Sequence, residues 1–191
     1  MVELVLASAS PRRAELLRQI GIKFRVDPAD IDESINAEEQ PIDLVERLAG
    51  QKASCKIASD RLVLAADTIV FDDVSILGKP RDRTDAIEML ARLSNRIHQV
   101  VTAICVANDD SMISQVVTTS VTLRPISEAE AIAYWDSGEP RDKAGGFAIQ
   151  GLGAVFVKNI QGSYSNVVGL PLFETAALLG RYGIQALRVR H

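Results

Sequence analysis

Blocks of apolar residues alternate with mixed polar segments along this chain and predict strands and helices in turn. Residues 62–71 are almost continuously apolar, which is typical of a strand in the middle of a sheet. Further apolar-rich runs predict strands at residues 4–7, 24–27, 74–77, 100–107, 116–123 and 154–160. Apolar residues at helical spacing predict helices at 11–20, 42–58, 84–93, 128–135 and 171–182.

The residues that flank these segments support the predicted boundaries. Ser10 and Pro11 suit a helix start, and Gly21 is placed to end that helix. Thr84 is expected to cap the third helix, and Ser127 with Glu130 forms a capping box. Residues 137–153 form a glycine-rich loop, and residues 162–166 a turn. The whole pattern predicts an α/β fold, a mixed sheet with flanking helices.

Composition narrows the class of protein. The length of 191 residues suits one domain over residues 1–191. The net charge of −4 argues against binding to a nucleic-acid polymer, and no apolar run approaches the length of a membrane span. Two cysteines in no metal-binding spacing suggest reduced thiols, so we expect a cytoplasmic protein. With only two histidines, a Ser–His–Asp triad is unlikely and chemistry should rest on carboxylates, lysines and arginines.

The turn after the first strand is a candidate phosphate site. Ser8, Ser10, Arg12 and Arg13 surround the predicted helix start, where unpaired N–H groups favour an anion. Two positive charges at this end of a helix oppose its dipole, and a bound anion between the two arginines would explain them. The alternative is a capped turn with two solvated arginines.

Four further charged positions stand out. Lys52 falls on the apolar side of its helix, so it either extends its amine to solvent or points at a buried anion. Asp67 interrupts the most apolar strand, where a carboxylate must be paired or bind a metal. Glu33 belongs to an acidic loop that offers oxygen ligands to Mg²⁺ or Mn²⁺, although such loops are more often simply solvated. Lys79 is a second lysine near the Asp67 strand.

Short blocks in a fixed order make the whole chain resemble the Maf family, the septum-formation-type nucleotide pyrophosphatases. The blocks are residues 6–13, 66–70, 78–80, 137–140, 142–145, 149–151, 162–164 and 166–171, with His98, Thr102 and Ala103. The resemblance implies an inosine-triphosphatase-like fold of two α/β lobes around a central cleft, with a homodimer as one possible assembly. It also implies hydrolysis of a nucleoside triphosphate to the monophosphate and pyrophosphate, with a divalent metal such as Mg²⁺ or Mn²⁺.

In such an enzyme we expect Asp67 to be the general base or to hold the metal that activates water. Glu33 is the expected second metal ligand. The expected phosphate ligands are Ser8, Arg13, Lys52 and Lys79.

Arg12, Thr68 and Gln150 match the pattern of the family's dTTP/UTP pyrophosphatases. The 7-methyl-GTP branch typically has tryptophan, glutamine and a Ser-Glu-Gly-like loop at the corresponding places. The Gln150 amide carries a donor and an acceptor, complementary to the N3–H and O4 edge of thymine and uracil. Modified pyrimidine nucleotides, 7-methyl-GTP, and a non-catalytic role as a nucleotide-binding regulator of septation or cell-division arrest remain alternatives. Asn95 replaces a glycine that is common in the family, and we expect no loss of fold because asparagine tolerates left-handed backbone.

Overall fold

The computed structural model describes residues 2–186, and these form two compact units made of discontinuous segments. Within the described chain, unit 1 takes residues 2–67, 102–117 and 169–186, and unit 2 takes residues 68–101 and 118–168. The described strands form a seven-stranded mixed sheet in the order β2-β1-β3-β5-β6-β7, with β4 paired to β3. The predicted α/β class with a mixed sheet is therefore confirmed, whereas the single domain and the central cleft stay predictions.

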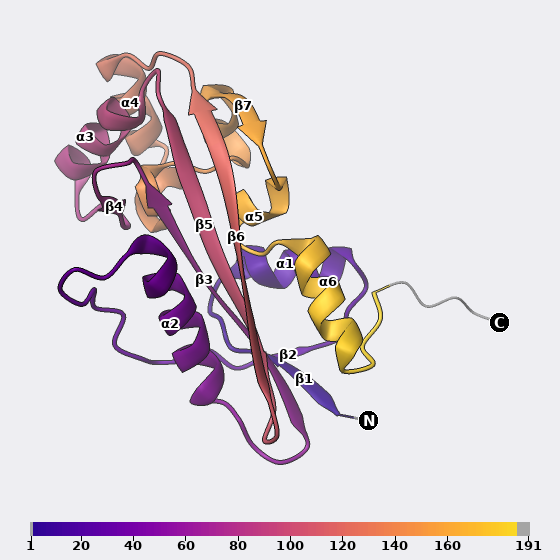
Figure 1. Ribbon diagram of the computed structural model, residues 1–191. Helices are drawn as coiled ribbons and strands as arrows, with labels where there is room; N and C mark the ends of the chain where they lie inside the picture. The colour runs from indigo at the N-terminus through magenta and orange to yellow at the C-terminus, as the bar shows by residue number, and fades with distance from the viewer. Residues whose placement is uncertain (1, 187–191) are drawn as a thin grey trace. The chain divides into compact units, whose positions relative to one another are not determined.

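Unit 1 is built on parallel strand pairing. Strand β1 (Glu3–Leu6) pairs in parallel with β2 (Arg25–Val26) and with β3 (Arg61–Phe71), placing Leu6 opposite Leu64. Helix α2 (Pro41–Ser54) lies on one side of these strands, and α1 (Pro11–Gln19) and α6 (Leu172–Arg181) lie on the other (Figure 1). Large apolar side chains from β1, β3 and the three helices are fully buried, among them Leu6, Leu17, Leu44, Leu64 and Leu179.

Unit 2 combines antiparallel strand pairs with short helices. Strand β4 (Ile76–Leu77) runs antiparallel to β3, and β7 (Val157–Gln161) runs antiparallel to β6 (Met112–Leu123). Helices α3 (Arg83–Leu93) and α4 (Glu128–Asp136) pack together, and β5 (Ile97–Ala107) continues from this unit into unit 1 (Figure 1). Its core includes Val70, Leu90, Leu93, Val121, Leu123, Tyr134, Phe147 and Phe156.

Several predicted boundaries are confirmed by their capping geometry. The Ser10 side chain accepts a hydrogen bond from the backbone of Arg13, and Gly21 has a φ of +72° just after α1. The Ser127–Glu130 capping box is present at the start of α4. Asn95 adopts a φ of +56°, the left-handed conformation expected of a residue that replaces glycine.

Other boundaries were predicted wrongly. Helix α2 ends at Ser54 rather than near residue 58, because the chain tightens to three-residue hydrogen bonds at Lys56 and Ile57. Asp82 caps α3 instead of Thr84, since its carboxylate accepts from the backbone N–H of Asp85 at 2.9 Å. Strands β5 and β6 begin three and four residues earlier than predicted, at Ile97 and Met112.

The long loop contains more structure than its glycines indicated. It forms three 3₁₀ helices, η1 (Glu139–Asp142), η2 (Ala144–Gly146) and η3 (Gly151–Phe156). Because η3 occupies residues 151–156, the last strand begins at Val157 and not at residue 154. The predicted turn at 162–166 is partly the short helix α5 (Tyr164–Val168).

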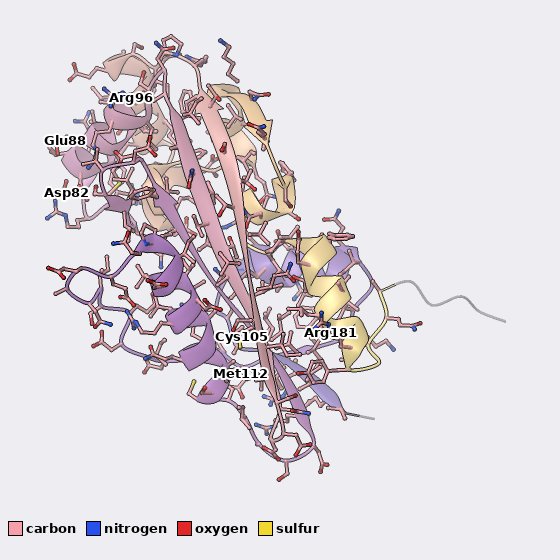
Figure 2. All side chains as sticks on the ribbon, in the orientation of Figure 1. Asp82, Glu88, Arg96, Cys105, Met112 and Arg181 are labelled. Carbon is pink, nitrogen blue, oxygen red and sulfur yellow. The ribbon has the colours of Figure 1, made fainter. Side chains whose placement is uncertain are left out.

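Two findings bear on the class of protein. Cys55 and Cys105 are both free thiols, as predicted, and Cys105 lies buried on β5 (Figure 2). Among residues 2–186, no helix combines the length and apolar character needed to cross a membrane.

Candidate functional site

The candidate phosphate site lies where β1 passes into α1 in unit 1. Ser8 is buried, and its hydroxyl oxygen accepts hydrogen bonds from the Ser10 backbone N–H at 3.2 Å and from Arg13 Nη1 at 3.1 Å. Arg13 Nε also donates to the carbonyl oxygen of Gly169 at 2.8 Å. The Arg13 guanidinium is therefore fixed from two sides, in the N-terminal turn of α1.

Electrostatics link this turn to two acidic residues. Burial lowers the pKa of Arg13, and the neighbouring positive charge of Arg12 lowers it too, while the negative charges of Asp67 and Glu33 act in the opposite direction. The structure thus brings Glu33 and Asp67 within electrostatic range of Arg13, although all three are far apart in sequence. This convergence was predicted for Arg13 and Asp67.

Lys52 holds the two carboxylates together. Its Nζ atom lies 2.7 Å from Asp67 Oδ1 and 2.7 Å from Glu33 Oε1. Lys52 and Asp67 are 7% exposed, whereas the Glu33 side chain is 56% exposed, so one carboxylate is enclosed and the other faces solvent. Of the two interpretations of Lys52, the buried-anion one is correct.

The donor set fits a small divalent cation. Two carboxylate oxygens contact one nitrogen atom, so they lie close together, and each carboxylate has a second oxygen. Among residues 2–186, no group of three or more histidine, cysteine or acidic side chains forms a metal cage. Mg²⁺ commonly binds through one or two carboxylates plus substrate phosphates, so the residues that would hold such an ion are Glu33 and Asp67.

The remaining predicted site residues belong to unit 2. Thr68 follows Asp67 on β3, and Gln150 precedes η3; both are half-buried. Lys79 is exposed and lines a cavity of about 320 Å³ between β4 and α3. Glu88, which Figure 2 labels on α3, lines the same cavity. The joint action of these three residues with the cluster in unit 1 stays a prediction.

Sequence reasoning gave no role to several residues that organise these sites. The Gly169 carbonyl positions Arg13, and the Glu139 carboxylate binds the backbone beside Gln150. Both residues belong to sequence blocks that carried the family resemblance. Their contacts could not be predicted, because the partners lie far away in the sequence. His98 is buried, with neither ring nitrogen hydrogen-bonded within the described chain.

Comparisons with known proteins agree with the resemblance. A protein named dTTP/UTP pyrophosphatase from Pseudoalteromonas translucida (strain TAC 125) is 54% identical over 177 residues, which covers 91% of this chain and 94% of the relative. A protein of the same name from Pseudoalteromonas atlantica is 51% identical over 187 residues, covering 95% and 97%. The solved structure of the Staphylococcus aureus Ham1 protein matches with a TM-score of 0.47 and 19% identity over 63% of this chain and 71% of that one. The model of the family described as Maf-like protein matches residues 3–182, and the chain belongs to this family.

Proposed function

We propose that this protein is a nucleoside triphosphate pyrophosphatase that hydrolyses dTTP and UTP to the monophosphate and pyrophosphate. The observation that carries the proposal is the placement of Lys52 Nζ at 2.7 Å from both Asp67 and Glu33, within electrostatic range of Arg13. A buried carboxylate among cations suits phosphoryl chemistry, because a passive binder of triphosphate gains nothing from an added negative charge. The names of the two Pseudoalteromonas relatives support the substrates.

The cationic side of the cluster would bind the phosphates. Arg13 is held by Ser8 and Gly169, so it presents its charge without first losing conformational freedom. Lys52 would exchange part of its contact with the carboxylates for a phosphate oxygen. Lys79 completes the proposed phosphate ligands from unit 2.

The acidic side of the cluster would activate water. Glu33 and Asp67 would hold Mg²⁺ or Mn²⁺, and either ion would supply charge neutralisation and a lowered pKa of bound water. The carboxylate of Asp67 would accept the proton of the attacking water, or orient that water through the ion. Its enclosed position keeps bulk water from competing for the same oxygen atoms.

Specificity would come from Arg12, Thr68 and Gln150. The Gln150 amide can donate to O4 and accept from N3–H, the edge shared by thymine and uracil. Modified pyrimidine triphosphates with the same edge would also be accepted. A homodimer and a link to cell-division arrest are further expectations of the family resemblance, and a cytoplasmic location is expected from the reduced cysteines.

A nucleotide panel tests the proposal. Purified protein is incubated with dTTP, UTP, CTP, ATP, GTP and 7-methyl-GTP in Mg²⁺, in Mn²⁺ and in EDTA, and both products are quantified by chromatography. We expect dTTP and UTP to be turned over fastest, to nucleoside monophosphate and pyrophosphate, with activity lost in EDTA. Fastest turnover of 7-methyl-GTP would contradict the substrate assignment, and nucleotide binding without turnover in either metal would favour a regulator.

A further inference from the structure

The loop that carries Gln150 is tied down by a single carboxylate in unit 2. Glu139, the first residue of η1, accepts hydrogen bonds from the backbone N–H groups of Leu152 at 2.8 Å and Gly153 at 2.9 Å. The hydroxyl of Tyr134 donates to the same carboxylate at 2.8 Å. One carboxylate thus accepts all three hydrogen bonds.

Tyr134 fastens the other side of Gln150. Its hydroxyl oxygen accepts a hydrogen bond from the Ala148 backbone N–H at 3.1 Å. Tyr134 is 4% exposed, and its ring packs edge-on against Phe156 with a centroid distance of 5.2 Å. The backbone is therefore held two residues before Gln150 and two residues after it, through one continuous set of hydrogen bonds that starts on a buried ring.

The two glycines of this loop are required by the same contacts. A Cβ atom on Gly151, whose φ is +69°, would lie 2.4 Å from Glu139 Oε2. A Cβ atom on Gly153 would lie 2.5 Å from the Tyr134 hydroxyl. The backbone approaches the Tyr134–Glu139 pair so closely that only glycine fits at these two positions. We call Tyr134, Glu139 and their hydrogen bonds to residues 148, 152 and 153 the clamp.

The protonation states of Glu139 and Tyr134 favour the hydrogen bonds between them. Burial tends to raise the pKa of Glu139, but the hydrogen bonds from Gly153, Leu152 and Tyr134 outweigh it, and the net pKa is lowered. Burial and the contact with Glu139 raise the pKa of Tyr134, so its hydroxyl keeps its proton. At neutral pH the carboxylate accepts and the phenol donates, as the observed geometry requires.

We propose that Glu139, together with Tyr134, is the positioning residue that sets the place of the Gln150 amide and hence the selectivity for thymine and uracil. This inference rests on the proposed function. Reading a base edge through one amide requires placement to within about 0.5 Å, and a displacement of about 1 Å costs up to about 100-fold in rate. Loosening the clamp therefore affects the preferred nucleotides more than the poor ones.

The test compares Glu139→Gln with a matched control. Glutamine keeps the size of the side chain but sets an NH₂ group against one of the backbone donors. Glu130→Gln is the control, because Glu130 also accepts three hydrogen bonds in unit 2, from Arg124 and from the backbone and hydroxyl of Ser127. Tyr134→Phe removes only the hydroxyl and is the second variant.

We expect Glu139→Gln and Tyr134→Phe to lower kcat/KM for dTTP and UTP by about 10-fold while that for CTP changes less than about 3-fold. Glu130→Gln should keep the wild-type selectivity even if its melting temperature falls. Because the clamp acts through Gln150, adding Glu139→Gln to Gln150→Ala should cost no further selectivity. Equal losses for all nucleotides, or additive losses in the double variant, would overturn the inference.

Amide hydrogen exchange separates the clamp from the proposed function. In Glu139→Gln the amides of Leu152 and Gly153 should exchange faster than in the wild type, whereas Glu130→Gln should leave them unchanged. Unchanged exchange in Glu139→Gln would overturn the clamp itself. Wild-type protein with no preference for dTTP and UTP would instead overturn the proposed function, and with it the selectivity role of Glu139.

Discussion

At the scale of single residues, the Lys52–Asp67 pair is the most informative contact. A carboxylate that is 7% exposed is tolerable only with a partner, and Lys52 lies at salt-bridge distance from it. The sequence predicted that Asp67 is unusual, because a charge in an apolar strand is costly. The sequence could not identify its partner, since Lys52 is equally compatible with a side chain that extends to solvent.

Removing the two members of this pair should have unequal effects. Lys52→Met leaves Asp67 enclosed without its ion-pair partner, and we expect a loss of about 3 kcal/mol in the free energy of unfolding. Asp67→Asn should cost less, because Lys52 keeps Glu33 at 2.7 Å. Urea unfolding at pH 7 measures both. A Lys52→Met variant as stable as the wild type would contradict the described pairing.

The buried His98 makes the stability of the protein depend on pH. Burial lowers the pKa of His98 to about 4, with a small opposing effect from Asp72, against an ordinary value of 6.5. Between these values the unfolded chain binds the proton and the folded chain does not, so stability falls as the pH falls below 6.5. We expect a loss of about 1.6 kcal/mol between pH 6.5 and pH 5, with a slope that approaches about 1.4 kcal/mol per pH unit once the unfolded chain is fully protonated.

The measurement is urea unfolding of the wild type and of His98→Leu across this range, which lies above the ordinary titration of carboxyl groups. The slope against pH should be smaller in the variant. Parallel curves for the two proteins would show that His98 is not the titrating group.

At the scale of elements, the sequence predicted helix and strand starts where a local signal marks them. Ser10 before Pro11 and the Ser127–Glu130 box are such signals, because their hydrogen bonds are made within a few residues. The 3₁₀ helices between Glu139 and Phe156 were missed. Their shape depends on contacts with Glu139 and Tyr134, which no local pattern encodes.

Substitutions at two glycines test whether the loop approaches Tyr134 as closely as described. Gly153→Ala places a Cβ atom 2.5 Å from the Tyr134 hydroxyl and the Ala148 carbonyl oxygen, so we expect a loss of about 1–3 kcal/mol in stability. Gly180→Ala on α6 meets nothing within 4 Å and should be neutral or stabilising by about 0.5 kcal/mol. Thermal unfolding of both variants compares them. Equal effects would mean that the loop does not approach Tyr134 as described.

At the scale of the whole molecule, parallel pairing explains why distant residues meet in unit 1. The parallel pairing of β1 with β3 ends at Leu6 and Leu64. Ser8 and Asp67 lie shortly beyond these two residues, so both lie at the same end of the paired segment. That convergence could be predicted from the order of strands and helices. The return of the chain at Gly169 to bind Arg13 could not, because it depends on where α6 packs.

The central claim is that Asp67 performs chemistry and does not merely balance Lys52. The most direct measurement is turnover and binding of dTTP by Asp67→Asn, with Asp27→Asn as control. Asp27 also pairs with a lysine of unit 1, since its Oδ1 lies 2.7 Å from Lys56 Nζ. We predict that Asp67→Asn loses pyrophosphate release by at least about 100-fold while still binding dTTP, and that Asp27→Asn keeps wild-type turnover. Wild-type turnover by folded Asp67→Asn would contradict the claim.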